Sequence, residues 1–267
     1  MTLSRTLAIA LRQYYLVRGS FARFLPMFTW VAIDMLVYGY LSRYLDSVAG
    51  GTVGFLPRML GAVLLWDFLV RVAHGVTIAF LEDVWSRNFL NFFATPLKVS
   101  EYLGGLIMTS IATSAVGLVV MLFLSTLVFG LPFFSFGLLA FPYLMILFLC
   151  GIALGVAGAA MVLRLGPASE WFVWMIPATI MPFAAVFYPV AGLPAWMRGV
   201  SHAVPPSYVF EGLRTSLAAG HLSAQPLLVG GGLSALYVFL ACWFFRNTYR
   251  HAIRTGLIAR YSAESST

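Results

Sequence analysis

Four ionisable residues lie inside long apolar runs of the sequence, namely Asp34, Asp67, Arg71 and His74. Asp67 and Arg71 are four residues apart and His74 follows three residues later, so all three share one face of a helix. Charged groups are costly at membrane depth, which makes these four candidates for lining a proton or substrate path together with Tyr38. The alternative is that Asp67 and Arg71 neutralise each other within one helix and help it to pack.

The longest polar interruption in the first half of the chain runs from Glu82 to Gly105. Residues 82–95 predict a short amphipathic helix at a membrane surface, followed by a turn at Thr95 and Pro96. We expect this segment to receive force from a partner protein, and the alternative is an ordinary interfacial loop. Its charged face would comprise Glu82, Asp83 and Arg87, and its bulky face Trp85, Phe89 and Leu90.

The composition indicates a membrane protein. Of the 267 residues, 61% are hydrophobic and 9% are charged, whereas a soluble domain carries about 25% charged residues. The net charge of +7 fits membrane topology better than a nucleic-acid surface, because the basic residues are not clustered. Cys150 and Cys242 lie in apolar runs, as buried small hydrophobic residues do. No nucleotide-binding, hydrolase or zinc motif is present, so we expect a transporter, channel or assembly subunit without catalytic residues or a metal site.

Six apolar segments are long enough to cross a bilayer, which takes about 20 residues. They cover roughly residues 21–41, 55–80, 102–129, 136–163, 171–190 and 227–245. Because backbone groups in lipid must be paired within the segment, runs of this length predict helices. The expected fold is a single all-α integral membrane domain over residues 1–267. Gly151, Gly155 and Gly158 predict that the fourth helix packs closely on another helix.

Three further regions complete the predicted architecture. Residues 1–20 predict an amphipathic helix in the plane of the interface, with its basic side chains toward the headgroups. Residues 191–226 predict two short outer helices that re-enter the membrane in part. Residues 246–267 form a basic tail. Arginine and lysine are more frequent on the side of the two termini, so the termini and residues 82–95 are expected to be cytoplasmic.

Three stretches of the sequence resemble the permease subunits of type-2 ATP-binding-cassette (ABC) exporters, a family that includes polysaccharide, lipo-oligosaccharide and drug exporters. ATPLKVSEYLG at residues 94–104 is similar to the sequence that follows the family's coupling helix. FYPVAGLPAW at residues 187–196 and VPPSYVFEGLR at residues 204–214 resemble the outer end of its fifth span and its outer helix. The chain departs from the family pattern at Leu106, which follows Gly105 where many relatives have lysine, and at Pro205, where many have asparagine.

The resemblance implies a pair of permease subunits, as a homodimer or with a paralogue, in the bacterial plasma membrane. Each copy would dock on a separate cytoplasmic ATPase subunit that binds ATP and Mg²⁺, while the chain itself would bind no cofactor. Residues 82–95 would be the coupling helix and residues 191–226 the outer gate. The gate residues would be Tyr188, Pro189, Pro194, Trp196, Pro205, Tyr208, Glu211 and Arg214.

The function implied is export of an amphipathic, lipid-linked or glycan substrate by alternating access. A small-molecule drug exporter is the alternative within the same family. From the residues alone, an ion-coupled secondary transporter that uses Asp34, Asp67, Arg71 and His74 also stays open.

Overall fold

The computed structural model describes residues 2–19, 25–50, 54–86, 92, 95–130 and 140–257, and every regular element in these ranges is a helix. This confirms the predicted all-α class. The helices are α1 (Leu3–Arg18), α3 (Pro26–Val48), α4 (Phe55–Trp85), α6 (Val99–Phe129), α7 (Phe141–Leu165), η3 (Pro167–Glu170), α8 (Trp171–Ile180), η4 (Val190–Gly192), α9 (Ala195–Ser201), α10 (Pro205–Ala219) and α11 (Ala224–Arg254).

Four of these helices, α4, α6, α7 and α11, are long and apolar enough to cross a membrane. They correspond to four of the six predicted spans and show the character of a membrane protein. α3 covers most of the first predicted span but is less apolar and is not among the four. The fifth predicted span, residues 171–190, is not one helix, because α8 ends at Ile180. Pro177 and Pro182 explain this ending, since neither can donate a helical hydrogen bond.

The core of the bundle lies around α7, which packs against α4 on one side and α11 on the other. A Cβ atom on Gly155 would lie 2.6 Å from the carbonyl oxygen of Ala73, so only glycine allows this approach of α7 to α4. The hydroxyl of Thr77 lies 2.9 Å from the carbonyl oxygen of Gly155 and donates to it. The glycine spacing therefore predicted close packing correctly, and the structure identifies α4 as the partner.

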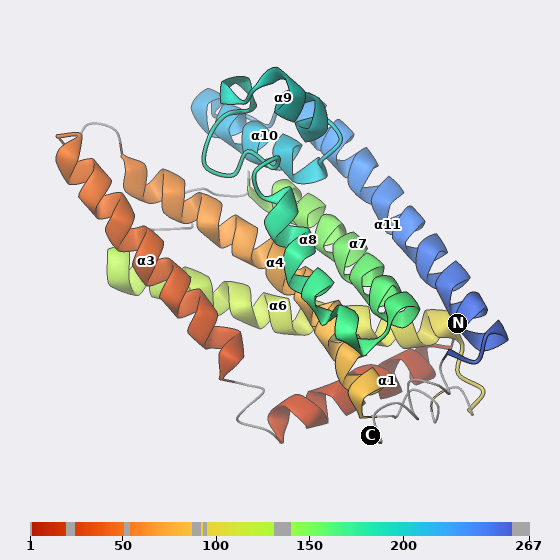
Figure 1. Ribbon diagram of the computed structural model, residues 1–267. Coiled ribbons are helices and arrows are strands. Elements are labelled where there is room, and N and C mark those ends of the chain that lie inside the picture. Colours follow the sequence, from red (N-terminus) through yellow and green to blue (C-terminus); the bar gives the residue numbers. More distant parts are fainter. Residues whose placement is uncertain are drawn as a thin grey trace.

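The two ends of the bundle carry different elements (Figure 1). α1 lies across the end at which α4 and α11 finish, and it packs on the start of α6. α9 and α10 lie at the opposite end, where α10 packs on α7 and α11. Residues 246–254, the first part of the predicted basic tail, continue α11, because no glycine or proline interrupts the helix there.

Candidate functional site

A buried carboxylate joins three helices at the α1 end of the bundle. Asp83, in the last turn of α4, has no exposed surface. Its Oδ1 atom lies 2.6 Å from a guanidinium nitrogen of Arg12 in α1, which donates to it. Its Oδ2 atom accepts a hydrogen bond of 2.8 Å from the phenol of Tyr102 in α6. A buried charge persists when it is paired and its remaining lone pairs are bonded, and Asp83 meets both conditions. We call Arg12, Asp83 and Tyr102 the α1 junction.

A second carboxylate holds the beginning of α1 to the beginning of α6. Oε1 of Glu101 accepts hydrogen bonds from the backbone N–H and the hydroxyl of Thr2, at 2.7 and 2.8 Å. Oε2 accepts from the backbone N–H of Lys98 at 3.0 Å, as a capping residue does at a helix start. The guanidinium of Arg5 lies 3.6 Å from Glu101 and also donates to the carbonyl oxygen of Pro96. α1 is thus bonded on both sides of the chain segment that connects α4 to α6.

An aromatic cluster surrounds the junction. The guanidinium carbon of Arg12 lies 4.8 Å from the ring centre of Phe92, a geometry that permits a cation–π contact. The rings of Phe92 and Tyr102 are 5.7 Å apart, and Phe80 lies edge-on to both Tyr102 and Phe245. Phe92 therefore ties the segment between α4 and α6 to the junction. Arg12, Phe92, Glu101 and Tyr102 were not predicted as site residues.

Two predictions about residues 82–95 are wrong. Glu82, Asp83 and Trp85 belong to the last turn of α4 and not to a separate amphipathic helix, since nothing in residues 80–85 interrupts the helical backbone. Asp83 cannot form an exposed docking face, because Arg12 and Tyr102 enclose it. Trp85 is half exposed, and Thr95 and Pro96 lie in an exposed turn, as predicted. Arg87, Phe89 and Leu90 lie outside the described residues.

The orientation of α1 also differs from its prediction. Arg5 and Arg12 bond to the protein rather than pointing toward headgroups. Thr6, Ile9 and Gln13 on the same side of α1 are buried, so the more polar face of α1 packs inward. The opposite face is exposed and apolar, as suits a helix that rests on lipid. It carries Leu3, Leu7, Leu11 and Tyr14.

The ionisable residues in the middle of the bundle are electrostatic neighbours, since Asp67 interacts with Asp34 and Arg71, and Arg71 with His74. Asp67 and Arg71 make no ion pair within 4.0 Å in the part of the chain that the structure describes, and Oδ2 of Asp67 and Nε of Arg71 are buried there without a hydrogen-bond partner. Arg71 faces α6, where a Cβ atom on Gly117 would lie 2.6 Å from its Cδ. His74 faces α8 and contacts Val173. Mutual neutralisation of Asp67 and Arg71 is therefore not achieved by a direct bond.

Tyr38, the remaining predicted path residue, and a small cavity beside His74 also lie in this part of the bundle. The ring of Tyr38 stacks on Phe187 at 5.6 Å, which links α3 to the segment after α8. A cavity beside His74 has a volume of about 10 Å³, at the lower limit for one water molecule. It is too small for a transported substrate. Within the described residues, no group of three or more His, Cys, Asp or Glu side chains is placed to hold a metal ion.

At the α9–α10 end, one arginine organises the irregular segment that follows α8. The guanidinium of Arg214 donates to the carbonyl oxygens of Ala185 and Val186, the latter at 2.8 Å, and lies 3.1 Å from Oε2 of Glu211. Desolvation lowers the pKa of Arg214, and the charge of Glu211 opposes that shift. The same carboxylate accepts from the backbone N–H of Val190 at 3.4 Å. Glu211 and Arg214, both predicted as gate residues, form an ion pair that also binds Ala185, Val186 and Val190.

The other predicted gate residues lie close to this segment in sequence or in space. The phenol of Tyr188 donates to the carbonyl oxygen of Pro182 at 2.6 Å, and that of Tyr208 to His202 at 3.0 Å. Trp196 is exposed and lies edge-on to Phe183. Three prolines mark the starts of helices, Pro189 before η4, Pro194 before α9 and Pro205 at the first residue of α10.

No protein-family model matches the sequence, and no curated protein matches it. The function must therefore be inferred from the geometry of these two ends and from the helices between them.

Proposed function

We propose that the chain is the permease subunit of an ATP-driven exporter, energised by a separate cytoplasmic ATPase that binds ATP and Mg²⁺. The observation that supports this best is the bonding of α1. Asp83 lies in the last turn of α4 and Glu101 in the first turn of α6, and α1 with its N-cap Thr2 binds both carboxylates. A displacement of this segment by a partner would thus reach α4, α6 and α1 together, because interior contacts transmit strain.

The opposite end of the bundle supports alternating access. α8 contains Pro177 and ends at Ile180, and the irregular residues that follow are held by side-chain bonds from Arg214 rather than by a continuous helix. Irregular backbone at membrane depth occurs where it is covered by protein or lines a water-filled cavity. We assign this end to the outer gate, with α9 and α10 as re-entrant helices.

In the proposed arrangement, α3 and the α8 region complete six spans, and both termini and α1 are cytoplasmic. Two copies pair in the bacterial plasma membrane around a path for an amphipathic, lipid-linked or glycan substrate. The exposed apolar faces of α6 and α11 leave ample surface for lipid and for a second copy. A small-molecule drug as the substrate is the alternative within this proposal.

The test is transport in reconstituted vesicles together with the ATPase that co-purifies with the chain. Transport should require ATP and the ATPase, and it should persist when the proton gradient is collapsed. Trp85→Ala combined with Arg87→Ala should lower substrate-stimulated ATP hydrolysis without preventing insertion, whereas Trp243→Ala, at an exposed tryptophan of α11, should not. Transport by the purified chain without any ATPase would refute the proposal.

An ion-coupled transporter is the second candidate, and one observation favours it. Oδ2 of Asp67 and Nε of Arg71 are buried without hydrogen-bond partners in the described part of the chain, and such groups at membrane depth mark ion pathways in many transporters. Collapse of the proton gradient separates the two candidates, because it would stop ion-coupled transport and leave ATP-driven transport intact.

A further inference from the structure

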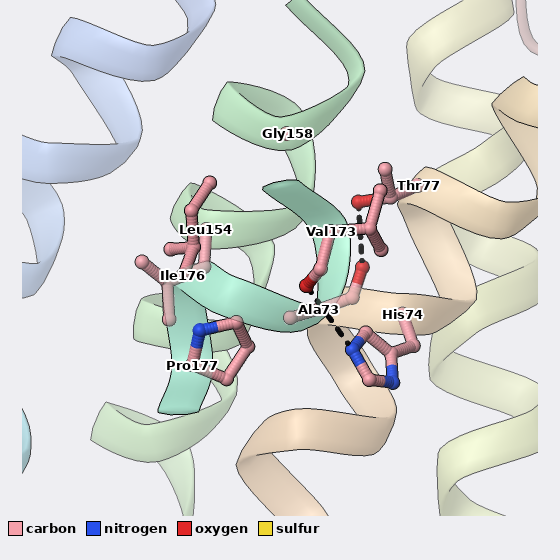
Figure 2. Close-up of a pocket in the computed structure, with 8 residues that line it drawn as sticks. All are labelled: Ala73, His74, Thr77, Leu154, Gly158, Val173, Ile176 and Pro177. Carbon is pink, nitrogen blue, oxygen red and sulfur yellow. Dashed lines mark hydrogen bonds between the residues drawn. The ribbon is translucent and has the colours of Figure 1, made fainter. Parts of the chain in front are cut away.

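α8 has a gap in its hydrogen bonding that another helix fills. Pro177 lies inside α8 and has no N–H, so the carbonyl of Val173, one turn earlier, lacks its helical donor. Nε2 of His74, in α4, lies 3.3 Å from that carbonyl oxygen (Figure 2). A carbonyl oxygen can only accept, so Nε2 of His74 carries the proton in this contact.

The surroundings of His74 favour this bond over a bond to water. Val173 is buried, and the ring of Trp174 lies edge-on to the ring of His74 with the centres 4.4 Å apart. The adjoining cavity, lined by His74, Thr77, Val173 and Pro177 among others, has a volume of only about 10 Å³. That volume leaves little room for water, so His74 is the described donor best placed for the carbonyl of Val173.

The position of His74 along α4 connects the two ends of the bundle. Asp83 of the α1 junction follows nine residues later, which is about 13 Å along a helix. After α8 ends at Ile180, the chain runs through residues 181–190, where Arg214 donates to the carbonyl oxygens of Ala185 and Val186. One turn beyond His74, Thr77 bonds to Gly155 of α7. α8 is therefore attached to α4 at the point where its own helix is incomplete.

We propose that His74 is a positioning residue that makes α8 follow α4, so that a displacement at the α1 junction reaches the segment after α8. The proposal rests on the proposed function in supposing that α4 moves during transport. It assigns His74 to coupling between helices and not to a proton path. Its physical basis is the hydrogen bond that Pro177 removes from α8 and His74 replaces.

The test uses three variants of the purified chain. His74→Phe keeps a ring beside Trp174 but removes the donor. His74→Phe combined with Pro177→Ala restores a backbone N–H to Val173 within α8 but not the link to α4. His74→Gln keeps a side-chain N–H. The first variant should lower the midpoint of thermal unfolding by about 2–4 °C, as expected for the loss of one buried hydrogen bond in a chain of this size. The double variant should recover that loss.

The second readout is the distance between spin labels at Arg58→Cys in α4 and Met175→Cys in α8, both exposed positions, with Cys150 and Cys242 replaced. The doubly labelled chain with His74 unchanged should give a narrow distribution of label-to-label distances, and so should the doubly labelled chain that carries His74→Gln. His74→Phe should give a broader one, and the double variant should stay broad although its stability has recovered. A narrow distribution in the double variant would show that His74 only satisfies the carbonyl, and would overturn the proposal. So would an unchanged unfolding midpoint in His74→Phe.

These two measurements need no ATPase, so they separate this inference from the proposed function. ATP-dependent transport is the third readout, and it should fall relative to ATP hydrolysis in both His74→Phe and the double variant. If the unmodified chain showed no ATP-dependent transport, the proposed function would fail, while the distance distributions would still decide whether His74 attaches α8 to α4.

Discussion

The phenol of Tyr102 donates a hydrogen bond of 2.8 Å to Asp83, and both side chains are completely buried. They come from the two long helices that border the segment between α4 and α6, and Arg12 of α1 binds the other carboxylate oxygen. Three helices thus share one carboxylate at this end of the bundle. A change at any member of the junction should be detected as a change in how α1, α4 and α6 pack.

Tyr102→Phe tests the junction with the smallest possible change. The variant removes one hydroxyl and leaves Oδ2 of Asp83 without that donor, which costs about 1–3 kcal/mol for a buried group. Thermal unfolding in detergent should show the loss. Tyr44→Phe is the matched control, because the side chain of Tyr44 is 65% exposed and the change should cost less than about 0.5 kcal/mol. Equal effects of the two variants would contradict the role of the junction.

Gly105→Ala tests the close approach of α1 to α6. A Cβ atom at Gly105 would lie 2.5 Å from Cβ of Ile9 and 3.0 Å from the carbonyl oxygen of Thr6. α1 must therefore shift away from α6, and its backbone amides should exchange hydrogen faster than in the unmodified chain.

Gly61→Ala in α4 is the control for Gly105→Ala, since a Cβ atom there meets nothing within 4 Å. Alanine should stabilise that helix by up to about 1 kcal/mol. Unchanged hydrogen exchange of α1 in Gly105→Ala would show that α1 is not held through this contact.

The sequence predicts what depends on local pattern and misses what depends on distant neighbours. α4, α6, α7 and α11 were predictable because each is a long apolar run, and the spacing of Gly151, Gly155 and Gly158 indicated close packing. The burial of Asp83 was not predictable, since its partner Arg12 is 71 residues away and an acid at the end of an apolar run is more often exposed. The early end of α8 was missed because residues 171–190 were interpreted as one span from their apolar character, although Pro177 and Pro182 lie among them.

Arg214→Gln tests how the segment after α8 is held. Arg214 donates to the carbonyl oxygens of Ala185 and Val186, and Ala185 adopts a φ of 54°, which an alanine keeps only when its surroundings enforce it. Loss of these bonds should cost about 1–3 kcal/mol and should speed limited proteolysis within residues 181–190. Arg214→Lys should recover only part of the stability, because an ammonium cannot present the same fork of donors.

The control for Arg214→Gln is Arg58→Gln, which removes an exposed arginine at the start of α4. It should leave proteolysis of residues 181–190 unchanged. If Arg58→Gln and Arg214→Gln sped cleavage equally, the effect would reflect lost charge rather than the bonds to Ala185 and Val186.

Asp67→Asn and Asp83→Asn make the same chemical change at two positions of α4 and should have opposite consequences. Oδ2 of Asp67 is buried without a hydrogen-bond partner in the described part of the chain, so replacing a carboxyl by an amide there removes no bond and lowers the cost of burial. We expect normal yield and a change in unfolding free energy below about 1 kcal/mol. Asp83 binds Arg12 and Tyr102, so its amide leaves the partly exposed guanidinium of Arg12 without its counter-charge and weakens both bonds, at a cost of about 1–3 kcal/mol.

The comparison also separates the two interpretations of the charges in the middle of the bundle. If Asp67 serves a path, Asp67→Asn should fold normally and alter transport, because only its charge and proton affinity change. If it served mainly to neutralise Arg71, folded yield should fall as it does for Asp83→Asn. Yield measured by detergent extraction and gel filtration decides between these outcomes, and a loss of yield as large at Asp67 as at Asp83 would overturn the prediction.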